Sequence, residues 1–122
     1  MMTADEWEQS TDPRAMLLAT QDRVDPRLIW RLIAVFGRRV WDQLPWEGLR
    51  KAIATTERWL DGQASEDDLN GDWFDATAGG ASLTEGWATA YELLLDYELA
   101  KLLPPEELCE MMRRALGNPF RS

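Results

Sequence analysis

The sequence contains no histidine and only one cysteine among its 122 residues. Without imidazole the chain cannot form a Ser-His-Asp triad, a Cys-His dyad or a histidine-based zinc or di-iron site. One cysteine cannot form an internal disulfide, so a disulfide framework is excluded and a cytoplasmic location is expected. An active site would have to depend on carboxylates, Lys, Arg, Tyr, Ser, Thr or Cys109. We therefore expect a protein that is not an enzyme.

Long apolar runs and an excess of basic residues are missing as well. The most apolar stretch, residues 28–36, is interrupted by Arg31 and has about half of the ~20 residues that a membrane-spanning helix needs. The first residues are acidic where an export signal would be basic. Asp and Glu number 22 against 13 Lys and Arg, which gives a net charge of −9. Because this charge repels nucleic acid and anionic lipid, we expect no direct contact with nucleic acid or membrane.

Helix start and stop signals are abundant along the chain. Capping boxes, Asp-Pro pairs at helix starts and glycines at helix ends divide the sequence into helical segments. The predicted helices are two turns from residue 3, then residues 13–22, 26–44, 46–61, 65–74, 82–103 and 105–116. No stretch shows the period-two alternation of a half-buried strand.

These signals predict an all-α fold, a compact single-domain bundle of five to seven helices over residues 1–122. A chain of this length suits one domain, since domains cluster near ~100–150 residues. The helices over 26–44 and 82–103 are expected to form a central antiparallel pair. The acidic segment near 63–82 contains several glycines, and we expect it to be mobile.

One arc of the helix predicted from residue 26 is basic. At about 100° per residue, Arg27, Arg31 and Arg38 share a narrow arc, and apolar residues occupy about half of the circumference. Two interpretations of this arginine stripe are open. The arginines pair with acids such as Glu92 and Asp96 across a helix-helix groove, or they are free and bind an acidic partner surface or a peptide carboxylate.

Seven tryptophans are several times the usual number for a chain of this length. Trp30, Trp41 and Trp87 fall on apolar helix faces and are expected in the core. Trp46 and Trp59 lie near helix ends or at the margin of an apolar face, where the indole N–H can stay in water. Because Trp and Arg dominate binding hot spots, an exposed Trp46 or Trp59 near the arginine stripe would form a protein-binding surface. The alternative is that all seven complete a small core.

No pattern predicts a cofactor or a metal. The acidic run at 66–72 lacks the alternating Asp order and the closing Glu of a calcium loop. Gly79 and Gly80 follow no strand and carry no phosphate-binding Lys. Cys109 falls on the apolar side of a helix beside two glutamates, which favours a buried thiol over a nucleophile.

Several short motifs, taken in order, resemble a group of uncharacterised bacterial proteins. Members of that group open with TEAEW, continue with TDP and ML, and carry a CCRR[IV]W helix and an FGNPFR segment. The corresponding segments of this chain are 3–7 (TADEW), 11–13 (TDP), 16–17 (ML), 38–41 (RRVW), the helix end at 57–62 and 117–121 (GNPFR). The resemblance spans nearly the whole chain and implies a helical fold, but no activity.

The chain departs from that group at two places. Phe36 and Gly37 stand where the group has paired cysteines, which removes any thiol chemistry of that pair. Members commonly continue beyond GNPFR, whereas this sequence stops at Ser122, so we expect it to correspond to the helical half alone.

Taken together, the sequence predicts a non-catalytic helical protein-protein interaction module with a protein partner; a homo-oligomer is left open. The alternative is a small acidic inhibitor or immunity-type protein that mimics charge. A carboxylate- and metal-dependent enzyme ranks last and would need three acids in one pocket. Phe120 either docks onto the last helix or projects as a ligand. The candidate partner-binding residues are Trp46, Trp59, Arg27, Arg31, Arg38 and Phe120.

Overall fold

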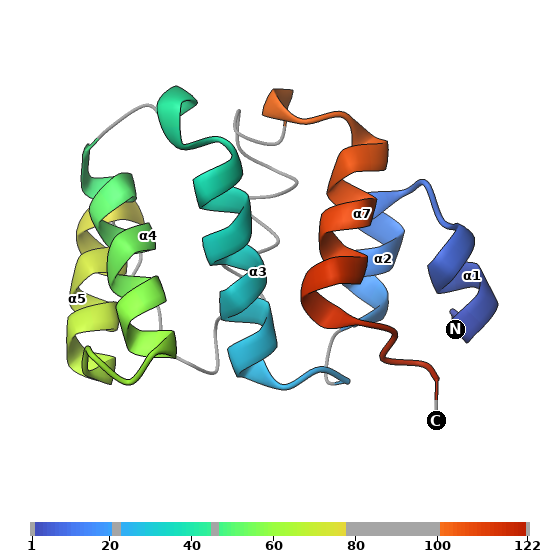
Figure 1. Cartoon of the computed structure of the whole chain (residues 1–122), viewed down its shortest axis with the longest axis horizontal. Helices are drawn as coiled ribbons and strands as arrows, with labels where there is room; N and C mark the ends of the chain where they lie inside the picture. Colours follow the sequence, from blue (N-terminus) through green and yellow to red (C-terminus); the bar gives the residue numbers. More distant parts are fainter. Residues whose placement is uncertain (1, 21–22, 45–46, 78–100, 122) are drawn as a thin grey trace.

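The computed structural model describes residues 2–20, 23–44, 47–77 and 101–121. Within these ranges the chain forms six α-helices and one 3-10 helix, and no strand, so the predicted all-α fold is confirmed (Figure 1). The elements are α1 (Ala4–Gln9), α2 (Pro13–Ala19), α3 (Pro26–Arg39), η1 (Trp41–Gln43), α4 (Glu47–Leu60), α5 (Glu66–Thr77) and α7 (Pro105–Leu116). The helix predicted over 82–103, and the central pair predicted with it, lie outside the described residues.

The helices begin where the capping residues predict. The Thr3 hydroxyl accepts a hydrogen bond from the Glu6 N–H, and the Glu6 carboxylate accepts one from the Thr3 N–H, which completes the capping box of α1. The carboxylates of Asp12 and Asp25 accept N–H groups in the first turns of α2 and α3, each ahead of a proline. At the start of α5, the Ser65 hydroxyl accepts a hydrogen bond from the Asp68 N–H, and the Asp68 carboxylate accepts one from the Ser65 N–H. Each such cap stabilises a helix by about 1 kcal/mol.

The predicted end of the third helix at residue 44 is wrong. The α-helix stops at Arg39, and the chain tightens into η1, where the Gln43 N–H donates to the Val40 carbonyl oxygen at 2.9 Å. The Trp41 carbonyl oxygen accepts a hydrogen bond from the side chain of Arg50 on α4, 3.2 Å away. The Trp41 carbonyl oxygen thus has a hydrogen-bond partner on α4. The periodicity of the sequence does not predict such a contact between helices.

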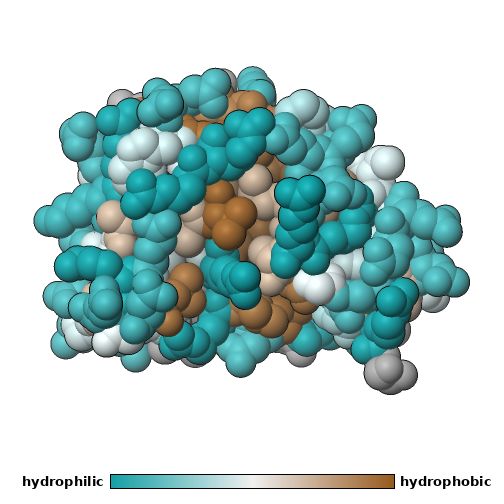
Figure 2. Space-filling model, in the orientation of Figure 1, coloured by the Kyte–Doolittle hydropathy of each residue, from teal (hydrophilic) through white to brown (hydrophobic). Residues whose placement is uncertain are grey.

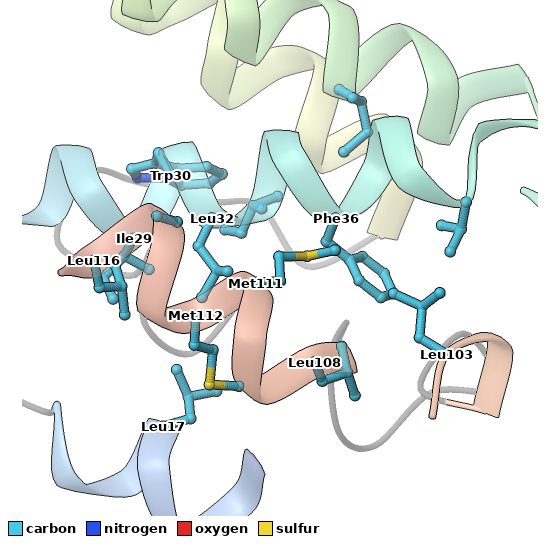
Figure 3. Close-up of a cluster of buried hydrophobic side chains, with 14 of the residues drawn as sticks. Leu17, Ile29, Trp30, Leu32, Phe36, Leu103, Leu108, Met111, Met112 and Leu116 are labelled. Atoms are coloured by element: carbon cyan, nitrogen blue, oxygen red, sulfur yellow. The ribbon is translucent and has the colours of Figure 1, made fainter. Parts of the chain in front are cut away.

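The third helix lies at the centre of the described helices. Figure 1 shows α3 with α4 on one side and α7 on the other, α5 beside α4, and α2 beyond α7. Leu32 and Phe36 project from α3 toward α7 (Figure 3). From the opposite side, Leu17 of α2 meets Met112 of α7. The core is therefore built on α3, half of whose residues are buried.

The third and fourth helices approach each other closely at one glycine. A Cβ added to Gly37 would lie 2.5 Å from the Cδ1 atom of Ile53, which is well inside van der Waals contact. Gly37 and Ile53 are both buried. The crossing of α3 and α4 thus depends on the absence of a side chain at residue 37.

Part of the acidic segment expected to be mobile is a packed helix. Residues 66–77 form α5, in which Leu69 and Trp73 are fully buried. Residues 78–82 lie outside the described residues.

Hydrogen bonds between side chains join α5 to α4. The Trp73 Nε1–H donates to the Thr56 hydroxyl oxygen at 2.8 Å, and that hydroxyl donates to the Ala52 carbonyl oxygen at 2.8 Å. The neighbouring Thr55 hydroxyl donates to the Asp72 carboxylate. Because the Trp73 and Thr56 side chains are buried, their hydrogen bonds fix α5 against α4.

Candidate functional site

The only side of α3 that faces solvent carries an apolar residue within the arginine stripe. Arg27, Arg31, Val35 and Arg38 are spaced at i, i+4, i+8 and i+11, so they share one face of the helix. Val35 remains 40% exposed. Figure 2 shows hydrophobic residues at the surface in the middle of this side of the molecule, between hydrophilic rims. We call these four residues the α3 face.

A groove runs along each side of the α3 face. The α3–α4 groove has a volume of about 700 Å³. It is lined by the arginine stripe, by Leu28 and Val35, by Glu57 and Leu60 of α4, and by Asp61 just after α4. The α3–α7 groove has a volume of about 720 Å³. Val35 and Arg38 line both grooves, so the exposed valine stands on the ridge between them.

Arg38 is held at one end of the α3–α4 groove. Its Nε donates to both carboxylate oxygens of Glu57, at 2.9 and 3.0 Å, and its Nη2 donates to one of them at 2.7 Å. The guanidinium carbon lies 4.0 Å from the ring centroid of Trp41. The hydrogen bonds to Glu57 raise the pKa of Arg38, while desolvation acts in the opposite direction. Arg38 is therefore charged at every physiological pH, with its charge matched by Glu57.

Arg27 is held at the other end of the groove. Its Nη2 donates to the Leu60 carbonyl oxygen at 2.8 Å, and its guanidinium carbon lies 4.8 Å from the ring centroid of Trp59. Trp59 is only 8% exposed, so the expectation of an exposed indole at this position is wrong. The packing of α4 against α3 buries the ring, with Arg27 above it. Trp46, the other indole expected at the surface, lies outside the described residues.

Arg31 lies between these two held arginines. It is exposed, and it forms no hydrogen bond or ion pair with any residue in the described ranges. Glu92 and Asp96, the acids expected to pair with the stripe, lie outside those ranges. Arg38 instead pairs with Glu57.

The two grooves differ in charge. The α3–α7 groove is lined by three arginines and three glutamates, among them Arg39 and Glu107, whose side chains approach to 2.6 Å. The α3–α4 groove is lined by three arginines and two acids, and Glu57 is already bound to Arg38. The excess of positive charge therefore lies in the α3–α4 groove.

Phe120 packs against the core beside the opening helix. Its ring packs on Trp7 of α1, with centroids 5.8 Å apart, and the guanidinium of Arg23 lies 5.3 Å from its centroid. The side chain is partly buried. The ring therefore lies between the opening helix and Arg23, at the margin of the core.

Sequence reasoning missed Val35, although the signal for it was present. Val35 is four residues after Arg31 and three before Arg38, which places an apolar side chain on the polar arc of the helix. Leu28 and Leu60 were also missed. Their place in the groove follows from the packing of α4 against α3, which periodicity does not give.

The described part of the chain holds neither a metal-binding cluster nor a membrane-spanning helix. No three acidic or cysteine side chains there lie close enough together to hold a metal ion. None of the helices described is both long and apolar enough to cross a membrane.

The chain matches no protein-family model, no curated protein and no solved structure. The motif resemblance to the bacterial group therefore stays a prediction.

Proposed function

We propose that the chain is a non-catalytic protein-interaction module and that its partner binds the α3 face. The observation that carries the proposal is the position of Val35. This valine is 40% exposed on the ridge between two grooves, one turn from Arg31. Arginine is enriched in binding hot spots, and the core of an interface is more apolar than the rest of the surface, so arginines around an exposed apolar side chain favour a protein-binding role.

The held arginines add to this argument. A flexible side chain that becomes ordered on binding loses about 0.5–1.5 kcal/mol of conformational freedom. Arg27 is already fixed by the Leu60 carbonyl and the Trp59 ring, and Arg38 by Glu57 and the Trp41 ring. Arg27 and Arg38 are therefore already ordered before a partner binds. A partner that contacts the ends of the groove does not lose binding free energy by ordering these two side chains.

The alternative, an acidic inhibitor that mimics charge, needs acids gathered for a partner. The described chain has exposed acids in the first turn of α5, at Glu66, Asp67 and Asp68. Acids in a first helical turn interact favourably with the helix dipole. An ordinary structural role accounts for these three, so we favour the interaction module.

Affinity capture from native extract tests the proposal with two matched variants. Leu18 and Val35 are both exposed large apolar residues, at 47% and 40%, but Leu18 is on α2 and lines neither groove. We expect a stoichiometric partner that wild type and Leu18→Glu retain and Val35→Glu loses, with unchanged helical circular dichroism. Equal retention by Val35→Glu contradicts the proposal. A partner lost only as salt is raised, whatever stands at residue 35, favours the charge mimic.

A further inference from the structure

We infer that the α3–α4 groove binds an acidic amphipathic helix of the partner, with a carboxylate on Arg31 and apolar side chains against Val35 and Leu28. The inference rests on the proposed function and adds the chemistry of the partner segment. Three features of the groove support it: its surplus of positive charge, the apolar side chains that line it, and the absence of a strand in the described ranges.

The charges lining the groove favour carboxylates. Glu57 is bound to Arg38, so Arg27 and Arg31 face a single remaining acid, Asp61. At physiological ionic strength charges are screened beyond about 8 Å, so the net charge of −9 acts weakly at contact and the nearby guanidiniums dominate. A carboxylate on Arg31 would form charge-assisted, bidentate hydrogen bonds.

The lining of the groove favours a helix over an extended segment. An extended peptide gains most of its affinity from main-chain hydrogen bonds to an exposed sheet edge. The described ranges contain no strand, and side chains of α3 and α4 line the groove. A helix satisfies its own main-chain groups, so it can lie in such a groove on side-chain contacts alone.

The spacing of the stripe fits three turns of such a helix. Arg27 and Arg38 are separated by about 16 Å along α3, and Arg27 and Arg31 by about 6 Å. Two carboxylates at i and i+4 on the partner helix have the same separation of about 6 Å. One of them would face Arg31 and the other the N–H groups of Arg27 that Leu60 does not use. Apolar residues on the same stripe would cover Val35.

Selection from a displayed library of helical peptides, with the whole chain as target, tests the inference. We expect enriched peptides to carry Asp or Glu at i and i+4 beside Leu, Ile or Val. Their affinity should fall at least about tenfold in Arg31→Glu and decrease with added salt. Arg114→Glu is the matched control, because Arg114 is exposed and lines only the α3–α7 groove. The affinity of the enriched peptides for Arg114→Glu should stay within about twofold of their affinity for wild type.

The outcomes separate this inference from the proposed function. Peptides that lack acids, or that bind Arg31→Glu as well as wild type, overturn the acidic helix. If those peptides still lose binding in Val35→Glu, the interaction module stands. If no enriched peptide depends on either Val35 or Arg31, both the inference and the proposed function are overturned. Circular dichroism of each variant verifies that the fold is unchanged.

Discussion

The Nε1–H of Trp7 donates a hydrogen bond to the carbonyl oxygen of Gly117, 2.8 Å away and 110 positions later in the sequence. The contact is reinforced nearby. Arg113 Nη1 donates to the Trp7 carbonyl oxygen at 3.0 Å, and Asn118 Nδ2 donates to the Ala4 carbonyl oxygen at 3.0 Å. The first helix and the GNPFR segment after α7 thus hold each other. This gives Phe120 a structural role and leaves the α3 face as the candidate binding surface.

Replacing Trp7 by Phe tests the contact between the opening and closing segments. The substitution removes the indole N–H, so the Gly117 carbonyl loses its partner, and it shortens a fully buried ring. We expect the free energy of unfolding to fall by about 1–3 kcal/mol. Urea unfolding followed by circular dichroism measures the change. A variant as stable as wild type would show that the two segments do not depend on each other.

Gly37→Ala tests the close crossing of α3 and α4. The added methyl group would overlap Ile53, and overpacking of this kind costs about 1–3 kcal/mol. Gly71→Ala is the matched control, since Gly71 is inside α5 with no atom within 4 Å of the new Cβ. Alanine forms helix better than glycine by about 1 kcal/mol, so the control should be more stable than wild type. In urea unfolding, the free energy of unfolding should fall for Gly37→Ala and rise for Gly71→Ala. A rise for Gly37→Ala would contradict the close approach of α3 and α4 at residue 37.

Thr56→Val tests the polar contact between α4 and α5. Valine keeps the shape of threonine but removes the oxygen that accepts the hydrogen bond of the buried Trp73 N–H, which costs about 1–3 kcal/mol. In a Trp73→Phe background the same substitution should cost less, because no N–H is left unpaired. A double-mutant cycle by urea unfolding measures this coupling. If Thr56→Val lowers the free energy of unfolding equally in both backgrounds, Thr56 and Trp73 are not coupled.

The thiol of Cys109 gives a prediction about alkaline pH. Burial raises the pKa of Cys109, partly offset by the charge of Arg113. Above about pH 8.5 the unfolded chain loses this proton while the folded chain keeps it. The unfolded state then binds fewer protons, so this group's contribution to stability is complete below that pH and falls as the pH rises. Cys109→Ser should reduce the alkaline loss measured by urea unfolding at pH 7 and 9.5. Identical losses would contradict the raised pKa.

Local signals in the sequence predict the helix starts and little of the site. Thr3, Asp12 and Asp25 cap their helices through atoms two or three residues away, so sequence alone locates them. Trp41, just after α3, accepts a hydrogen bond from Arg50 of α4, and Arg27 of α3 lies over Trp59 of α4. No local pattern encodes these contacts between elements. The arginine stripe was visible from helical spacing. Which arginines are held by other side chains or by a carbonyl was not visible, because Glu57 and Leu60 come from another helix.

The most direct test of the account compares two methyl resonances. Val35 and Leu18 are both exposed, one on the α3 face and one on α2, so each reports on its own surface. A methyl-labelled chain is titrated with the captured partner or with an enriched peptide and followed by NMR. If the α3 face is the binding surface, the Val35 methyl signals shift while those of Leu18 stay in place. Binding that shifts Leu18 and leaves Val35 unchanged would contradict the claim that the α3 face is the binding surface.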